Sequence, residues 1–267
     1  MYPYISVFGI TLPSYGLMIA LGLTISNLLA MLICRQRSLS TDELLLLEAY
    51  AVLGGLLGAK LLYLAVSWRE IDWPRFFTAT YFNQLMQGGF VFYGGLIGGV
   101  SGALLAGQIH HISTTRYLRS LVFLLPLAHA FGRIGCFLAG CCYGVPYDGP
   151  LSVTYPSASF APSGIPIFPV QLVEAACLLC LSLVLSLVSR CTRGRHVLST
   201  YLMLYSLVRF FLERYRYDEA RGFILALSVS QWISLLLIVA GAVIFLIERR
   251  QHAVPLEPSF TQETTIP

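Results

Sequence analysis

The sequence of 267 residues contains few charged side chains. Asp, Glu, Lys and Arg make up 11% of it, whereas about 25% is usual in a soluble domain. Hydrophobic residues make up 57%, and the mean hydropathy is +0.74. The net charge of +4 is small and the basic residues form no long patch, which argues against nucleic acid as a partner. The composition therefore indicates an integral membrane protein.

Three further features are missing from the sequence. No basic region precedes the first apolar run, so we expect that no signal peptide is removed and that the first helix stays in the mature protein. No internal repeat is visible, which argues against the inverted-repeat architecture of many transporters. An odd number of cysteines in mostly apolar segments does not indicate a disulfide framework; the seven are Cys34, Cys136, Cys141, Cys142, Cys177, Cys180 and Cys191.

Long apolar runs are abundant. Each has about 17 to 23 residues, enough for a helix to cross a hydrocarbon layer of about 30 Å. Because lipid offers no hydrogen-bond partners, each crossing segment must pair its own backbone N–H and C=O groups. The runs lie at 12–34, 45–67, 88–108, 118–139, 168–189, 197–213 and 224–247. They predict an all-α polytopic membrane bundle of about seven transmembrane helices, which forms one domain over 1–250 and leaves a polar tail at 251–267.

Arginines in the connecting loops predict the orientation of this bundle, because the loops with more basic residues stay in the cytoplasm. One side carries nine of them: Arg35, Arg37, Arg116, Arg119, Arg190, Arg193, Arg195, Arg249 and Arg250. The opposite side carries five: Arg69, Arg75, Arg214, Arg216 and Arg221. We therefore expect the N-terminus outside, the C-terminus and its tail in the cytoplasm, and an irregular loop at 140–169 that faces outward.

Ionisable side chains inside the predicted spans are candidates for function, because placing a charge in lipid is expensive. They are Lys60, His129, Arg133, Glu174, Arg209 and Glu213. Several of these residues can also be explained by a structural role alone. Lys60 can snorkel toward the membrane surface or pair with a nearby carbonyl group. His129 can hydrogen-bond a neighbouring helix, and Glu174 can lie at the membrane interface. Arg209 and Glu213 have the i, i+4 spacing, so they can pair on one helix face.

Arg133 is harder to explain by structure alone. It has no acidic residue close in the sequence and lies in a glycine-rich segment at 132–144, which closes one apolar run at the outer face. A guanidinium group can bind a phosphate through two hydrogen bonds, which suits a phospholipid headgroup. A second glycine-rich segment lies at 88–99. Its small residues allow close helix packing, and its backbone N–H groups can alternatively face an anionic ligand.

Cys136, Cys141 and Cys142 form a cluster in the sequence. They fit three interpretations: a redox pair, a metal site or inert helix packing. The C-x4-C-C spacing lacks the paired ligands of a structural zinc site, so no metal is expected. A disulfide that joins Cys141 to Cys142 or to Cys136 is compatible with an outward-facing position, but inert packing is the interpretation that we favour.

Six motifs occur in order along the chain. They are Tyr15-Gly16-Leu17-Met18, F-Y-G-G-L-I-G-G at 92–99, G-R-I-G-C-F-L-A-G-C-C-Y-G at 132–144, F-P-V-Q-L-V-E-A at 168–175, R-F-F-L-E-R-Y-R-Y-D at 209–218 and S-Q-W-I-S at 230–234. Each is weak alone, but together they resemble the bacterial prolipoprotein diacylglyceryl transferase family over most of the chain. The longest is similar to the family pattern G-R-x-G-N-F-x-N-x-E-x-x-G.

The resemblance implies an enzyme and a reaction. Members of the family transfer a diacylglyceryl group from phosphatidylglycerol to the thiol of the lipobox cysteine of a prolipoprotein, and glycerol phosphate leaves. This first step of bacterial lipoprotein maturation needs no metal or organic cofactor. It takes place in the cytoplasmic (inner) membrane, with the active site toward the outer leaflet. The expected partners are therefore phosphatidylglycerol, prolipoprotein signal peptides and membrane lipid.

The resemblance also implies roles for individual residues. Arg133 and Arg209 would stabilise the charge on the leaving phosphate. Tyr15 and Glu213 would orient them or contact the headgroup, and Tyr93 occupies the position of the group that activates the thiol. The remaining matched positions are expected to bind or enclose the substrate; they are Gly94, Gly95, Cys136, Gly144, Gln171 and Glu174.

The chain departs from the family pattern at several positions. Tyr93 stands where many members have the histidine proposed to activate the thiol, and a phenol with a pKa of about 10 is a poor base near neutral pH. Cys136, Ala139 and Cys141 replace two asparagines and a glutamate of the pattern. Two other functions therefore stay open: a non-catalytic lipid- or peptide-binding membrane protein on the same scaffold, and a thiol redox membrane protein that uses the cysteine cluster.

Overall fold

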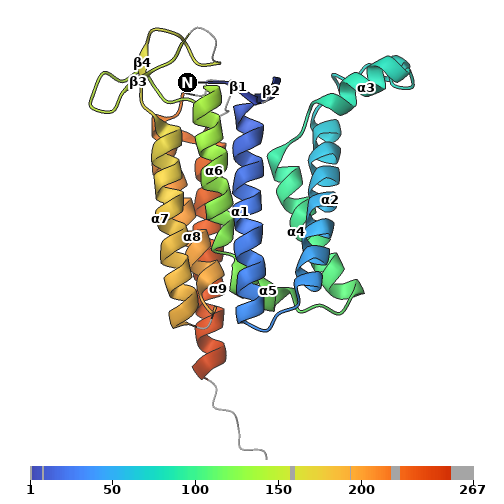
Figure 1. Cartoon of the computed structure of the whole chain (residues 1–267), viewed down its shortest axis with the longest axis vertical. Coiled ribbons are helices and arrows are strands. Elements are labelled where there is room, and N and C mark those ends of the chain that lie inside the picture. Colours follow the sequence, from blue (N-terminus) through green and yellow to red (C-terminus); the bar gives the residue numbers. More distant parts are fainter. Residues whose placement is uncertain (1, 8, 157–159, 193, 218–222, 254–267) are drawn as a thin grey trace, which may run out of the picture. The chain divides into compact units, whose positions relative to one another are not determined.

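The computed structural model of the chain describes residues 2–7, 9–156, 160–192, 194–217 and 223–253. Long helices dominate this part of the chain (Figure 1), which confirms the predicted helical membrane protein. Five of them are long and apolar enough to cross a membrane: α1 (Ser14–Gln36), α2 (Thr41–Val66), α4 (Phe92–Ile109), α7 (Val170–Cys191) and α9 (Val229–Ala253).

A further crossing is divided between two helices. α5 (Thr114–Leu121) and α6 (Leu124–Ala139) qualify as an apolar span only together, and they bend by 57° at the break between them. Pro126 explains the break, because it has no N–H to donate to the carbonyl group of Val122 and its ring crowds that group. The prediction of one continuous run at 118–139 was wrong at this point.

The predicted run at 197–213 forms α8 (Val197–Leu212). This helix has only 16 residues, whereas a crossing helix needs about 20. The described residues therefore contain five candidate spans, or six when the bent pair counts as one. The predicted number of about seven is not confirmed.

Short elements connect the long helices. α3 (Ala79–Gln87) and the 3-10 turn η1 (Trp73–Arg75) lie between α2 and α4, and a second 3-10 turn, η2 (Glu213–Tyr215), follows α8. The strands form antiparallel hairpins: β1 (Tyr4–Val7) with β2 (Ile10–Pro13), β3 (Val153–Thr154) with β4 (Pro166–Ile167), and β5 (Phe223–Ile224) with β6 (Leu227–Ser228). As predicted, the described residues between α6 and α7 are otherwise largely irregular.

Two helices begin later than the apolar pattern predicted. The run at 88–108 becomes helical only at Phe92, because Gly88 is extended and Gly89 is left-handed, with a φ of +70°. The run at 224–247 becomes helical at Val229, because its first residues form the last hairpin. Residues 251–253 of the predicted tail are helical, and 254–267 lie outside the described residues.

The chain divides into two compact units, residues 28–120 and residues 1–27 together with 121–267. In the first unit, glycines bring α2 and α4 into backbone contact. A β-carbon on Gly94 would meet the carbonyl oxygen of Gly58, and one on Gly98 would meet that of Gly54. Helices in lipid gain little from the hydrophobic effect, so close approach of small residues supplies the van der Waals contact that pairs them.

Lys60 lies on α2 of the same unit. Its Nζ atom donates hydrogen bonds to the carbonyl oxygens of Leu85 and Gly88, the second at 2.7 Å, and lies 5.0 Å from the centre of the Tyr63 ring. This confirms the interpretation that it pairs with nearby carbonyl groups.

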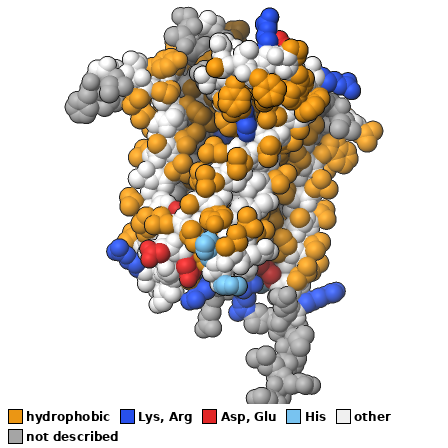
Figure 2. Space-filling model, turned by 90° about the vertical axis from the view of Figure 1, so that its right-hand side faces the viewer, with side chains coloured by type: hydrophobic (Ala, Val, Ile, Leu, Met, Phe, Trp, Pro, Cys, Tyr) orange, Lys and Arg blue, Asp and Glu red, His pale blue; other side chains and the backbone are white. Residues whose placement is uncertain are grey.

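On the face seen in Figure 2, hydrophobic side chains cover the middle, and Lys and Arg side chains lie mostly near the ends. Such a distribution is expected for a surface surrounded by lipid.

In the other unit, α6, α7 and α8 pack around small groups of buried side chains. One group contains Val122, Leu181, Leu185 and Val197, and another contains Ala130, Ala175 and Leu178. His129 on α6 contacts Tyr205 on α8, with 5.7 Å between the ring centres, so it meets a neighbouring helix through its ring. These contacts hold together the three helices that carry the candidate site.

Candidate active site

Two arginines and two glutamates form a network of ion pairs between neighbouring segments. Nε of Arg133 on α6 lies 3.1 Å from Oε1 of Glu174 on α7. Nη1 of Arg209 on α8 lies 3.8 Å from Oε2 of the same carboxylate, and its Nη2 lies 2.8 Å from Oε2 of Glu213 in η2. Glu174 thus joins two guanidinium groups that belong to different helices.

This geometry bears on three interpretations of the sequence. Arg133 does have an acidic partner, which the sequence did not reveal because Glu174 lies on the next long helix. Glu174 lies near the start of α7 and only 1% of the residue is exposed, so it faces the protein interior, while its position at the membrane interface stays a prediction. Arg209 and Glu213 pair as their spacing predicted. Removing one member of a buried ion pair leaves the other charge uncompensated, at a cost of about 3–5 kcal/mol. The members of the network therefore depend on one another.

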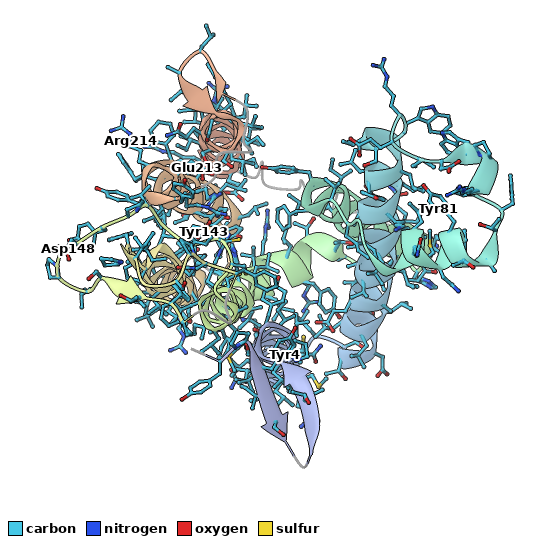
Figure 3. All side chains as sticks on the ribbon, turned by 90° about the horizontal axis from the view of Figure 1, so that it is seen from above. Tyr4, Tyr81, Tyr143, Asp148, Glu213 and Arg214 are labelled. Atoms are coloured by element: carbon cyan, nitrogen blue, oxygen red, sulfur yellow. The ribbon has the colours of Figure 1, made fainter. Side chains whose placement is uncertain are left out.

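The end of the unit that carries Glu213 is seen from above in Figure 3. Glu213 and Tyr143 lie among the helices, whereas Arg214 and Asp148 lie at the periphery. The ring of Tyr143 stacks on that of Tyr217, with 5.8 Å between their centres. The segment that follows η2 therefore packs against the loop that follows α6.

Gln171, one turn before Glu174, anchors that loop. Its Nε2 donates hydrogen bonds to the carbonyl oxygen of Cys141 at 2.9 Å and to the hydroxyl oxygen of Tyr155 at 3.3 Å. Burial raises the pKa of Tyr155 to about 12, so this hydroxyl stays neutral at physiological pH. These contacts position the loop beside the arginine network. A direct contact of Gln171 with substrate stays a prediction.

Backbone hydrogen bonds tie the loop to the start of α7 and to the end of η2. The N–H of Val145 donates to the carbonyl oxygen of Tyr215, and the N–H of Phe168 donates to that of Val145, both at 3.0 Å. A β-carbon on Gly144 would meet the carbonyl oxygen of Phe168 and lie 2.8 Å from that of Tyr215. The structure thus gives Gly144 a packing role, and its predicted contact with substrate stays a prediction.

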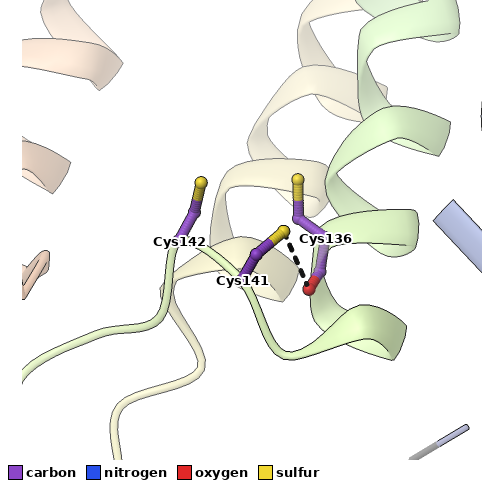
Figure 4. A group of neighbouring side chains, drawn as sticks. All are labelled: Cys136, Cys141 and Cys142. Atoms are coloured by element: carbon purple, nitrogen blue, oxygen red, sulfur yellow. Dashed lines mark hydrogen bonds between the residues drawn. The ribbon is translucent and has the colours of Figure 1, made fainter. Parts of the chain in front are cut away.

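The three clustered cysteines converge at the end of α6 (Figure 4). Gly140 ends the helix in the left-handed conformation, with a φ of +79°, and the N–H of Cys141 bonds back to the carbonyl oxygen of Cys136 at 3.1 Å. The thiol of Cys141 donates to the same oxygen at 3.8 Å, as the dashed line in Figure 4 shows. As a result, the Sγ atoms of Cys136, Cys141 and Cys142 all lie within 4.8 Å of one another. All three are free thiols.

Cys142 is held in an unusual conformation and environment. Its φ of +55° is left-handed, and a residue with a β-carbon in a sparsely populated region costs about 1–3 kcal/mol. Hydrogen bonds from the thiols of Cys136 and Cys141, together with the charges of Arg216 and Arg133, hold the pKa of Cys142 below its ordinary value. Arg216 is buried and had no predicted role; its place in the motif at 209–218 was the only signal.

The remaining predicted site residues lie on α1 and α4. Tyr15 is the second residue of α1, and its backbone lies against Gly135 of α6, whose β-carbon would be 3.2 Å from the Tyr15 Cα. Tyr93, Gly94 and Gly95 belong to the unit of residues 28–120. Tyr93 is 38% exposed at the start of α4, and both glycines face α2. The catalytic role of the tyrosines and the substrate contacts of the glycines stay predictions. Asp218, the last residue of its motif, lies outside the described residues.

Comparison with known proteins supports one family. The family model described as prolipoprotein diacylglyceryl transferase matches residues 3–247. Phosphatidylglycerol–prolipoprotein diacylglyceryl transferase 2 of Clostridium perfringens is 34% identical over 245 residues, which are 91% of this chain and 93% of the relative. The corresponding transferase of Clostridium tetani is 36% identical over 91% of this chain and 96% of the relative. The chain therefore belongs to the prolipoprotein diacylglyceryl transferase family, as its six motifs predicted.

Proposed function

We propose that this multi-pass membrane protein transfers a diacylglyceryl group from phosphatidylglycerol to a prolipoprotein, the first step of lipoprotein maturation. The single observation that carries the proposal at the level of residues is the shared carboxylate of Glu174, which brings Arg133 and Arg209 to one place. The family assignment does not favour the alternative of a non-catalytic binding protein.

The reaction creates a charge that this network can stabilise. The acceptor is the thiol of the lipobox cysteine, which must lose its proton to attack carbon. A bond forms between its sulfur and the glyceryl carbon. The bond between that carbon and the phosphate oxygen breaks, and the electron pair leaves with glycerol phosphate. Cations fixed in place beforehand stabilise the developing negative charge without reorganising during the reaction.

The two arginines take different parts in this scheme. The ion pair of Arg133 uses Nε, so its two Nη atoms lie beyond the pair and can fork onto a phosphate. Arg209 directs both Nη atoms at carboxylates, so it acts mainly through its charge. The carboxylates of Glu174 and Glu213 orient the guanidinium groups, because each is tied to a different segment.

We propose, further, the arrangement in the membrane that the arginine distribution predicts. α8 serves as a short seventh span, which is compatible with its apolar sequence and its 16 residues. The N-terminus faces outward and the C-terminus lies in the bacterial cytoplasm. The network, near the end of α6, then opens toward the outer leaflet of the cytoplasmic membrane.

The test uses purified protein, phosphatidylglycerol vesicles and a synthetic lipobox peptide. Arg133→Ala is expected to lower the rate of glycerol phosphate release by about 10²–10³-fold, as the loss of one transition-state donor does in other enzymes. Arg209→Ala is expected to lower it as well. Arg214→Ala is the matched control, because Arg214 is exposed at the periphery (Figure 3), and it should keep the wild-type rate. Wild-type rates in both network variants would contradict the proposal.

A further inference from the structure

Cys136, Cys141 and Cys142 stand beside the arginine network, but the scheme above does not use them. Their three Sγ atoms lie within 4.8 Å of one another, and none is in a disulfide. In Figure 4 the side chains of all three rise to the same side of the turn that follows α6. Three thiols at this separation can hold one metal ion.

The backbone is built to keep the thiols together. The N–H groups of Gly140 and Cys141 both bond to the carbonyl oxygen of Cys136, at 2.9 and 3.1 Å, so the chain folds back over the last helical turn. The carbonyl oxygen of Cys141 accepts the hydrogen bond of Gln171, which holds the turn from the side of α7. Cys142 keeps its left-handed φ of +55° although it has a β-carbon.

The geometry suits zinc with three protein ligands. Tetrahedral Zn–S bonds of about 2.3 Å place sulfur atoms about 3.8 Å apart, so the thiols need to move by about 1 Å at most. A structural site requires two pairs of ligands, which this sequence lacks. A catalytic site uses three protein ligands and leaves the fourth position open. Cys136 is buried and Cys142 is exposed, so the cluster reaches from the interior of the protein to its surface.

We propose that Cys136, Cys141 and Cys142 bind one Zn²⁺ ion as thiolates, and that its fourth position takes the thiol of the prolipoprotein. This inference rests on the proposed function and deepens it. The family pattern has a histidine, proposed to activate the thiol, where this chain has Tyr93. A thiol that coordinates zinc is deprotonated outright. Zinc therefore supplies the activation that the pattern assigns to the histidine.

The departures from the family pattern agree with this assignment. Cys136 and Cys141 replace an asparagine and the glutamate of that pattern, so the three-sulfur site depends on residues that the pattern itself does not provide. Three thiolates and Zn²⁺ carry a net charge of −1, and the substrate thiolate brings it to −2. Arg133 and Arg216, which interact electrostatically with Cys142, offset this charge.

The chemistry balances without an oxidant. The three cysteines release three protons to water when zinc binds, and the substrate thiol releases a fourth on coordination. The sulfur of the substrate then supplies the electron pair of the new S–C bond. The C–O bond to phosphate breaks, and its pair leaves with glycerol phosphate. The product is a thioether, which binds zinc more weakly than a thiolate and therefore dissociates.

The first measurement is metal binding by the full-length protein in detergent. Zinc content after reconstitution and washing should be one ion per chain in the wild type and none in the Cys136→Ser/Cys141→Ser/Cys142→Ser variant. Co²⁺ in place of zinc should give sulfur-to-metal charge-transfer bands and tetrahedral d–d bands in the wild type alone. Cys142→Ser tests the site with an exposed residue whose loss leaves the helix core intact, and it should weaken Co²⁺ binding.

Cys180→Ser and Cys191→Ser are the matched controls, because both thiols are exposed and lie outside the cluster. They should keep both the metal and the Co²⁺ spectrum. A lipobox peptide with its cysteine should shift the d–d bands of the Co²⁺ protein, and the same peptide with serine should not. Absence of the charge-transfer bands in the wild type, or bands of equal strength in the triple variant, would overturn the metal site. A spectrum unchanged by the cysteine peptide would overturn the proposed fourth ligand.

Activity separates this inference from the proposed function. The triple variant should lose about 10²-fold or more in transfer rate, comparable to the loss of a general base. If the wild type and the triple variant transfer diacylglyceryl equally well, the proposed activation of the thiol by zinc is refuted and the transferase stands. If the wild type binds Co²⁺ through sulfur but transfers nothing, the proposed function fails and the metal site alone remains.

Discussion

Replacing Glu174 by glutamine removes the one negative charge that Arg133 and Arg209 share. The shape of the side chain is kept, so the change tests charge alone. Glu174 is 1% exposed, and the two arginine side chains are 15% and 12% exposed, so water can solvate none of them well. Breaking a buried ion pair costs about 3–5 kcal/mol. Arg209 keeps Glu213 at 2.8 Å, so the loss falls mainly on Arg133 and the lower end of this range applies.

The measurement is thermal unfolding of the detergent-solubilised protein followed by circular dichroism. A loss of about 3 kcal/mol corresponds to a fall in Tm of about 6–12 °C for a chain of this size. Asp72→Asn is the control, because its pair with Arg75 joins side chains that are 42% and 75% exposed. Exposed pairs contribute about 1 kcal/mol or less. Equal changes in Tm for the two variants would refute the idea that Glu174 holds the network together.

Three further predictions follow from other contacts. Gly98→Val should destabilise the α2–α4 pair by about 1–3 kcal/mol through overpacking, whereas Gly132→Ala, whose β-carbon meets nothing within 4 Å, should not; unfolding in denaturant compares them. Gln171→Leu should make the loop after α6 more sensitive to protease, since its bonds to Cys141 and Tyr155 are lost; unchanged cleavage would contradict the anchoring role. Because burial raises the pKa of Tyr155 from 10.0 to about 12, its neutral form stabilises the fold below pH 10 and that contribution disappears as the pH rises through 12. Tyr155→Phe should remove this part of the pH dependence of Tm.

Hydropathy predicted the long helices because each must satisfy its backbone within lipid, but it could not predict where backbone geometry interrupts them. Pro126 divides the run at 118–139, and Gly89 delays the start of α4. The short helix α8 was found in the right place. Its 16 residues, however, are fewer than the roughly 20 of a usual crossing helix, and hydropathy alone did not reveal where the helix ends.

The motifs contain the residues of the ion-pair network, but the contacts between one motif and another could not be predicted. Arg133 and Glu174 lie in separate motifs, and only the packing of α6 on α7 brings them together. The i, i+4 pair of Arg209 and Glu213 could be predicted, since it depends on helix periodicity alone. The meeting of the three thiols could not, because it depends on the left-handed turn at Gly140.

The backbone hydrogen bonds of Val145 with Tyr215 and Phe168 affect which side chains can be replaced near the site. Main-chain pairing is indifferent to most side chains, so the frame that joins the ends of three helices survives substitutions along it. Glycine at 144 is the exception, because carbonyl oxygens crowd that position. Because peptide groups hold this frame together, the neighbouring positions 136 and 141 can carry cysteine where the family pattern has asparagine and glutamate.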